Sequence, residues 1–130
     1  MVKVITVKTN RQTELVDITP KVAEAISGVQ EGICFIYCPH TTAGIIINEG
    51  ADPAVAEDIL SVFNHVIPWK FSYKHLEGNS PAHVKASLTG PETFVFIEDG
   101  RLKLGTWQRI FFAEYDGPRT RKVYVKVIAG

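Results

Sequence analysis

Hydrophobic and polar residues alternate along several stretches of this chain, which is the pattern of strands with one buried face. The clearest example is the C-terminal stretch 122–128, where three valines alternate with lysine and tyrosine. Two N-terminal stretches, 2–7 and 12–18, are rich in β-branched residues and are separated by a short polar segment. We therefore predict that they pair as neighbouring strands. The nearly continuous apolar runs 33–37 and 44–47 are typical of strands buried on both faces.

Helix starts are marked three times by a capping residue followed by proline, the usual first residue of a helix. These pairs are Thr19–Pro20, Asp52–Pro53 and Ser80–Pro81. Apolar residues recur at helical spacing after each pair, so we predict three short helices, the third directing Val84 and Leu88 toward the core. A hairpin is expected across Asp99–Gly100, a dipeptide suited to a tight type I′ turn. Together the elements predict one α+β domain, residues 1–130, with antiparallel-rich, sandwich-like sheets.

Composition limits the classes of protein to which this chain can belong. Its 130 residues are enough to bury a core without disulfides, and its formal net charge is zero. No apolar run reaches the ~18 residues of a membrane span, so we expect a soluble protein without a membrane partner. The N-terminus lacks the features of a secretory signal, which predicts a cytoplasmic location. We do not expect the protein to bind nucleic acid, because its basic residues do not alternate with aromatic residues on which bases could stack.

Charge is distributed unevenly, because residues 101–130 contain seven basic and two acidic side chains. Such a run is usually a solvated strand face, but it also permits an anion-binding pocket. The arginines that would serve such a pocket are Arg109, Arg119 and Arg121. The two cysteines, Cys34 and Cys38, lie four residues apart on a predicted strand, about 13 Å from each other. They cannot bridge, so both are expected to be buried free thiols.

Three histidines fall on separate predicted elements and are the main candidates for chemistry. His40 lies between two buried strands, His75 in an irregular loop, and His83 in the first turn of a helix. The positive end of that helix disfavours protonation of His83, as a metal ligand or a base requires. His65 instead lies near a helix C-terminus and is expected to be a surface residue. Three converging imidazoles would form a zinc-type site with one open position, although dispersed histidines are more often simply satisfied polar residues.

Polar neighbours of these histidines have two possible roles. They can orient an imidazole or accept a proton, or they can be turn and cap residues. The candidates are Glu49, Asp52, Glu77 and Asn79. The segment Gly105–Gln108 is also open to two interpretations, a bulge with a core tryptophan, or a loop in which Thr106 and Gln108 hydrogen-bond a ligand. Standard catalytic signatures such as HExxH, CxxC and GxSxG are absent from the sequence.

In combination, these motifs resemble those of the YjbQ-like family. The matching segments are Pro39–Ala43, Asn48–Glu49, His75 to Asn79 to His83, Gly100–Leu102 and Gly105–Gln108. The resemblance covers nearly the whole chain. It implies an α+β sandwich that assembles as a homotrimer, with a histidine cluster near subunit boundaries that is able to hold a metal ion. Family members are described as secondary thiamine-phosphate synthases, which join hydroxymethylpyrimidine diphosphate to thiazole phosphate and release pyrophosphate.

Carried onto this sequence, the resemblance implies a divalent ion, zinc or magnesium, held by His40, His75 and His83. It makes Glu49, Asn79, Thr106 and Gln108 the candidate catalytic residues, and the three arginines named above would neutralise a phosphorylated substrate. The expected function is therefore a metal-assisted enzyme acting on a small phosphorylated metabolite. The alternatives are a trimeric metal- or phosphometabolite-binding protein without catalysis, or purely structural histidines.

Overall fold

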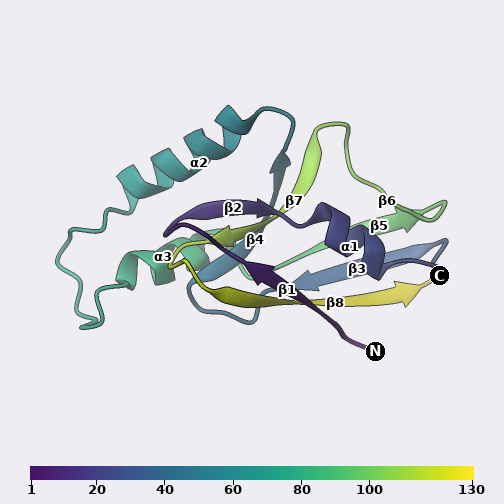
Figure 1. Ribbon diagram of the computed structural model, residues 1–130, viewed down its shortest axis with the longest axis horizontal. Coiled ribbons are helices and arrows are strands. Elements are labelled where there is room, and N and C mark those ends of the chain that lie inside the picture. The colour runs from purple at the N-terminus through teal and green to yellow at the C-terminus, as the bar shows by residue number, and fades with distance from the viewer.

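The computed structural model describes all residues from Met1 to Gly130 as eight strands and three helices (Figure 1). The strands are β1 (Lys3–Lys8), β2 (Glu14–Asp17), β3 (Gly32–Tyr37), β4 (Ala43–Glu49), β5 (Glu92–Glu98), β6 (Arg101–Leu102), β7 (Gln108–Glu114) and β8 (Thr120–Ala129). The helices are α1 (Thr19–Ala25), α2 (Pro53–Val66) and α3 (Ser80–Thr89). The predicted α+β class and the number of helices are confirmed.

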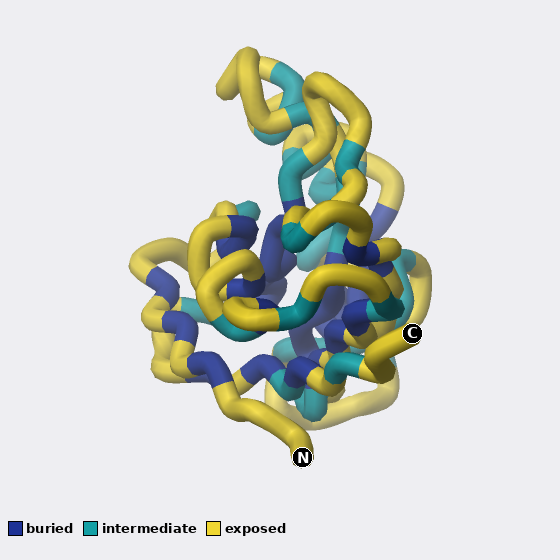
Figure 2. The backbone as a smooth tube through the Cα atoms, turned by 90° about the vertical axis from the view of Figure 1, so that its right-hand side faces the viewer, coloured by how far each residue is buried: buried dark blue, intermediate teal, exposed yellow.

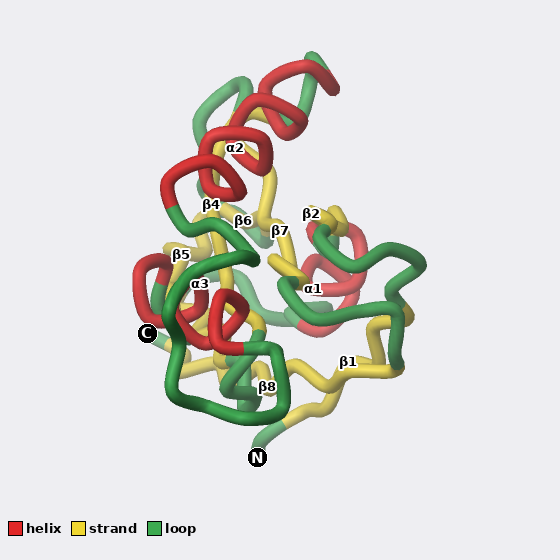
Figure 3. The backbone as a smooth tube through the Cα atoms, turned by 90° about the vertical axis from the view of Figure 1, so that its left-hand side faces the viewer, coloured by secondary structure: helices red, strands yellow, loops and turns green.

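The strands form two antiparallel sheets. The large sheet has the order β1-β8-β3-β5-β6 and the small sheet the order β2-β7-β4. Residues from the facing sides of both sheets, together with α1, make up the main core, which lies between the sheets and appears as the dark-blue interior of Figure 2. Helix α2 contributes no fully buried residue and lies at one end of the molecule (Figure 3), where Leu60 and Phe63 pack against the smaller core that contains Ala113 and Tyr115.

The predicted pairing of the two N-terminal strands is wrong. β1 pairs with β8 in the large sheet, whereas β2 pairs with β7 in the small sheet. The polar segment between them is a crossover from one sheet to the other. Sequence proximity favours pairing only when the two strands share a sheet, and here the C-terminal strand β8 lies between β1 and β3.

Strand β3 is buried on one face only, which corrects the prediction of burial on both. Cys34 and Ile36 point into the core, while Phe35 and Tyr37 remain 40% and 48% exposed. No helix covers this side of the large sheet. Its outer face is therefore uncovered and exposes apolar side chains beside Lys122 and Lys126. We call its apolar part the aromatic face; it comprises Val4, Phe35, Tyr37, Phe94, Phe96, Tyr124 and Ile128.

The helix caps agree with the sequence in one case of three. The Asp52 carboxylate accepts a hydrogen bond from Ala54 N at 2.9 Å and caps α2 as predicted. Thr19 is not a cap, because its Oγ1 accepts a hydrogen bond from Ile110 N at 2.7 Å and so ties α1 to β7. Ser80 is already the first residue of α3 and provides no capping side chain.

Helix α3 also turns a different face toward the core from the predicted one. Val84 and Leu88 are exposed, while Ala82 and Ala86 are buried together with Ala113 and Tyr115 of the second, smaller core. Small alanine side chains allow the helix to approach the sheet closely, and this outweighs the larger apolar area of valine and leucine. The Asp99–Gly100 turn, in contrast, is as predicted: both residues have positive φ, and β5 pairs with β6 across it.

Candidate functional site

His40 lies in the loop between β3 and β4 and is attached to the large sheet. Its Nε2 accepts a hydrogen bond from the backbone N–H of Lys122 on β8 at 2.9 Å. Its ring is nearly perpendicular to that of Phe112, with the two ring centroids 6.4 Å apart. Burial, and then the positive charge of Arg121, hold the pKa of His40 below its ordinary value of 6.5. His40 is therefore neutral around pH 7.

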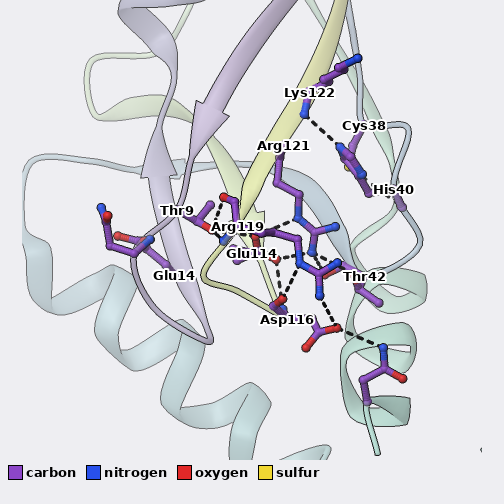
Figure 4. Close-up of polar contacts among 12 residues, drawn as sticks. Thr9, Glu14, Cys38, His40, Thr42, Glu114, Asp116, Arg119, Arg121 and Lys122 are labelled. Carbon is purple, nitrogen blue, oxygen red and sulfur yellow. Dashed lines mark hydrogen bonds and ion pairs between the residues drawn. The ribbon is translucent and has the colours of Figure 1, made fainter. Parts of the chain in front are cut away.

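A buried ion pair anchors this loop (Figure 4). Arg121 donates from Nε to Glu114 Oε1 at 2.8 Å and from Nη2 to Glu114 Oε2, and it also donates to Thr42 Oγ1 at 2.8 Å. Glu114 accepts two more hydrogen bonds, from Thr9 Oγ1 and Asp116 N. Burial alone would raise the pKa of Glu114, but these bonds lower it below its ordinary value. The pair fixes Thr42, two residues after His40, in one position.

His83 and His75 lie beside each other, and His83 also borders a hollow shared with His40. The centroids of the two rings are 5.4 Å apart and the rings are nearly perpendicular, while His75 Nε2 is 3.8 Å from Glu77 Oε2. The hollow has a volume of about 340 Å³. It is lined by His40, Thr41, Ala43, His83, Ala86, Ser87 and Pro91. We call it the histidine hollow.

A polar chain begins at the residue immediately before α3. Asn79 Nδ2 donates to Asp116 Oδ2 at 3.0 Å, and Arg119 Nη2 donates to the same oxygen at 3.0 Å. Asn79 Oδ1 is buried and has no hydrogen-bond partner. Asn79 and Arg119, both predicted site residues, are therefore linked through a carboxylate that the sequence did not indicate.

Within one chain, the three histidines are not arranged as the predicted metal site. No group of three His, Cys, Asp or Glu side chains is arranged to hold a metal ion. His40 Nε2 is already an acceptor for Lys122 N, so its lone pair is engaged. Cys38 is no substitute, because it is almost fully buried and burial raises the pKa of its thiol.

The remaining predicted site residues lie at the opposite end of the small sheet. In the β4–β7 register Ala43 faces Glu114, next to the histidine loop, and Glu49 faces Gln108. Six residues of strand separate these positions by about 20 Å. Gln108 Oε1 accepts a hydrogen bond from Gly105 N at 2.8 Å, and Thr106 is exposed beside it. This end is separate from the histidine hollow within one chain.

The interpretation of this segment as a bulge with a core tryptophan is wrong, because the Trp107 side chain is 63% exposed. Its backbone carbonyl accepts a hydrogen bond from Gly50 N at 2.9 Å. The segment Gly105–Gln108 is therefore a surface turn held by its own glutamine and by the end of β4. Contact between this turn and a ligand stays a prediction.

Each of the three arginines proposed for phosphate binding is paired with a carboxylate. Arg109 Nε lies 2.7 Å from Asp17 Oδ2 at the far end, and Arg119 is paired with Asp116. Arg121 is only 3% exposed and its charge is matched by Glu114. Arg121 thus positions the histidine loop in this structure, whereas Arg119 is near the loop and exposed. A role of the three arginines at a phosphate stays a prediction.

The sequence analysis missed Glu114 and Thr42, which secure the histidine loop. One signal was present in the sequence: Arg121 is in phase with the buried residues Val123 and Val125 of β8, so its side chain had to enter the core. A buried arginine requires an acid partner. Glu114 follows the apolar run 110–113 at the end of a strand, which marks it as the candidate.

Comparisons with known proteins agree with this architecture. The profile of the family described as "UPF0047 protein YjbQ-like" matches residues 3–130. A UPF0047 protein of Methanocaldococcus jannaschii is 57% identical over 94% of this chain and 90% of its own length, and YugU of Bacillus subtilis is 49% identical over 98% and 99%.

Solved structures give the same result. An uncharacterised YjbQ/UPF0047 protein of Clostridium acetobutylicum has a TM-score of 0.95 at 53% identity, covering 97% of this chain and 99% of its own. A protein of unknown function from Sulfolobus solfataricus has a TM-score of 0.94 at 38% identity, covering 100% and 97%. None of the three helices is long and apolar enough to cross a membrane. The chain belongs to the YjbQ-like UPF0047 family.

Proposed function

We propose that the histidine hollow binds a small phosphorylated metabolite and acts on it, and that thiamine-phosphate synthesis is the first reaction to test. The observation that supports this proposal is the convergence of His40 and His83 on one hollow of about 340 Å³, with His75 beside His83. Three separate segments supply these rings. A purely structural role would not require His40 and His83 to border the same open hollow.

Charge near the hollow suits a phosphorylated ligand. Arg119, just before β8, is exposed and its charge reaches His40, while exposed Lys122 holds His40 through its backbone N–H. Departure of pyrophosphate from hydroxymethylpyrimidine diphosphate needs stabilisation of negative charge, which such groups provide. No step of the proposal depends on a metal ion, since the three imidazoles of one chain are not arranged to hold one.

The test is a direct assay of product formation. Purified protein is incubated with hydroxymethylpyrimidine diphosphate and thiazole phosphate, and thiamine phosphate is quantified by chromatography. We expect His83→Ala to lower the rate at least about tenfold, because it removes a ring from the hollow. His65→Ala is the matched control, since His65 is an exposed histidine near the end of α2. Equal rates for both variants would exclude the hollow as the site of reaction.

Binding without turnover is the second candidate, and one observation favours it. The hollow offers no activated nucleophile for reactions through a covalent enzyme intermediate: the Cys38 thiol is buried, and the Ser87 hydroxyl donates to the carbonyl of His83 at 2.9 Å. Saturable binding of both phosphorylated substrates without any product would support this alternative over an enzyme.

We further propose that the chain assembles as a homotrimer and resides in the cytoplasm. The aromatic face supports assembly, because an exposed apolar patch of this kind usually marks an interaction surface. About 20 Å separates the two groups of predicted site residues within one chain. Assembly would bring them together if the far end of one copy lies beside the hollow of another. Light scattering on the purified protein measures the number of chains directly.

A further inference from the structure

We infer that His40 is a neutral hydrogen-bond donor to an oxyanion through its Nδ1–H, so that the histidine hollow recognises a phosphate or diphosphate group without a metal ion. This inference rests on the proposed function, in which the hollow holds a phosphorylated metabolite. It changes the expected role of His40 from a metal ligand to an anion-recognising group.

The first step of the argument is the tautomer of the ring. A backbone N–H can donate only to an unprotonated nitrogen, and Lys122 N donates to His40 Nε2 at 2.9 Å. A neutral imidazole carries one proton, which must therefore lie on Nδ1. Binding a metal ion through Nδ1 would remove that proton, and binding through Nε2 would break the bond to β8.

The second step is the surroundings of Nδ1. The His40 ring makes one hydrogen bond in the structure, the bond from Lys122 N to Nε2. Its Nδ1 is not among the buried polar atoms without a partner. Nδ1 is therefore not fully buried, and the ring to which it belongs lines the histidine hollow. A donor in such a position suits an acceptor-only ligand, such as a phosphate oxygen.

The third step is the charge around the ring. The groups around His40 are Arg121 and Glu114, Arg119 just before β8, the backbone N–H of Lys122 on β8, and the edge of the Phe112 ring. Arg121 is paired with Glu114, and the more exposed Arg119 is paired with Asp116. The charges of both arginines disfavour protonation of His40, so the ring stays a neutral donor.

The fourth step concerns the opposite wall of the hollow. Helix α3 forms this wall with His83, Ala86 and Ser87, and Pro91 follows its C-terminal end. His40 and His83 thus border the hollow from two different elements. The volume of about 340 Å³ fits a phosphate or diphosphate group together with part of a small metabolite.

The test uses inorganic pyrophosphate as the probe and two variants of His40. Glutamine places its polar end near the position of Nε2, and asparagine places its amide near Nδ1. We expect His40→Asn to bind pyrophosphate within about threefold of the wild type, and His40→Gln to bind at least about tenfold more weakly, because one bond to a charged acceptor is lost. Affinities are measured by calorimetry in the presence of EDTA, with His65→Gln as the matched control.

The tautomer is measured independently of any ligand. A ¹H–¹⁵N correlation spectrum of the imidazole nitrogens at pH 7.5 is expected to show His40 protonated at Nδ1 and unprotonated at Nε2, without change on addition of Zn²⁺. The opposite tautomer, a Zn²⁺-induced shift of His40, or loss of pyrophosphate binding in EDTA would each overturn the inference. Pyrophosphate binding without synthesis of thiamine phosphate would remove the proposed reaction and leave this inference intact.

Discussion

The buried pair between Glu114 and Arg121 offers the sharpest test of how this fold positions its histidine loop. We consider Glu114→Gln, which keeps the size of the side chain and removes its charge. Both carboxylate oxygens of Glu114 accept hydrogen bonds in the native protein, from Arg121 twice and from Thr9 and Asp116 once each. The amide nitrogen of glutamine would face donors on one side, and Arg121 would remain buried without a counter-charge.

The magnitude follows from the burial of the pair. Glu114 is fully buried and Arg121 is 3% exposed, so solvent cannot replace the lost partner. Breaking one side of a buried ion pair typically destabilises a protein by about 3–5 kcal/mol. We expect this loss in the free energy of unfolding for Glu114→Gln. Arg119→Gln breaks the more exposed pair with Asp116 and is expected to cost less than about 1 kcal/mol.

Urea unfolding followed by circular dichroism measures these differences, at one fixed protein concentration because assembly contributes to stability. The pH dependence is a second measurement. The pKa of Glu114 is lowered, so its stabilisation is present above the ordinary value of 4.5 and is lost as the pH falls through the folded-state pKa. Glu114→Gln should lack this acid loss. A destabilisation below about 1 kcal/mol together with an unchanged acid limb would refute the reasoning.

Three further outcomes are expected. The free energy of unfolding of Lys85→Met should stay within about 1 kcal/mol of the wild-type value at pH 7, because Lys85 is buried beside Asn64 without a carboxylate partner. A larger loss in urea unfolding would contradict this. Since burial lowers the pKa of Lys85, the wild type should also gain stability relative to Lys85→Met as the pH rises toward 10.5. Leu88→Gln should change the unfolding midpoint little, whereas Ala82→Leu should destabilise by about 1–3 kcal/mol by overpacking, and the reverse order would contradict the observed face of α3. Phe94→Asp on the aromatic face should preserve the circular dichroism spectrum and lower the native mass in light scattering, and an unchanged mass would exclude that part of the face from assembly.

Local interactions decided the features that the sequence predicted correctly. Asp52 caps α2 through the amide two residues later, and the Asp99–Gly100 turn needs only its own two residues to adopt positive φ. The alternation of β8 specifies which of its side chains are buried, because the side-chain period of a strand is two. Each of these outcomes depends on neighbours within a few positions along the chain.

Long-range contacts decided the rest. Whether β1 pairs with β2 or β8 depends on which sheet each strand joins, and nothing in residues 2–18 specifies this. The same holds for α3, where close packing against Tyr115 selects the alanine face over the face carrying Leu88.

For the candidate site, the sequence determined that histidines, an asparagine and several arginines were present on separate elements. The tertiary structure decided which of them meet: His40 and His83 border one hollow, whereas Gln108 lies at the far end of the small sheet. It also decided the protonation of His40, since a backbone N–H 82 residues away along the chain donates to its Nε2. The partner of a polar side chain depends on the packing of distant segments, which the order of residues does not display.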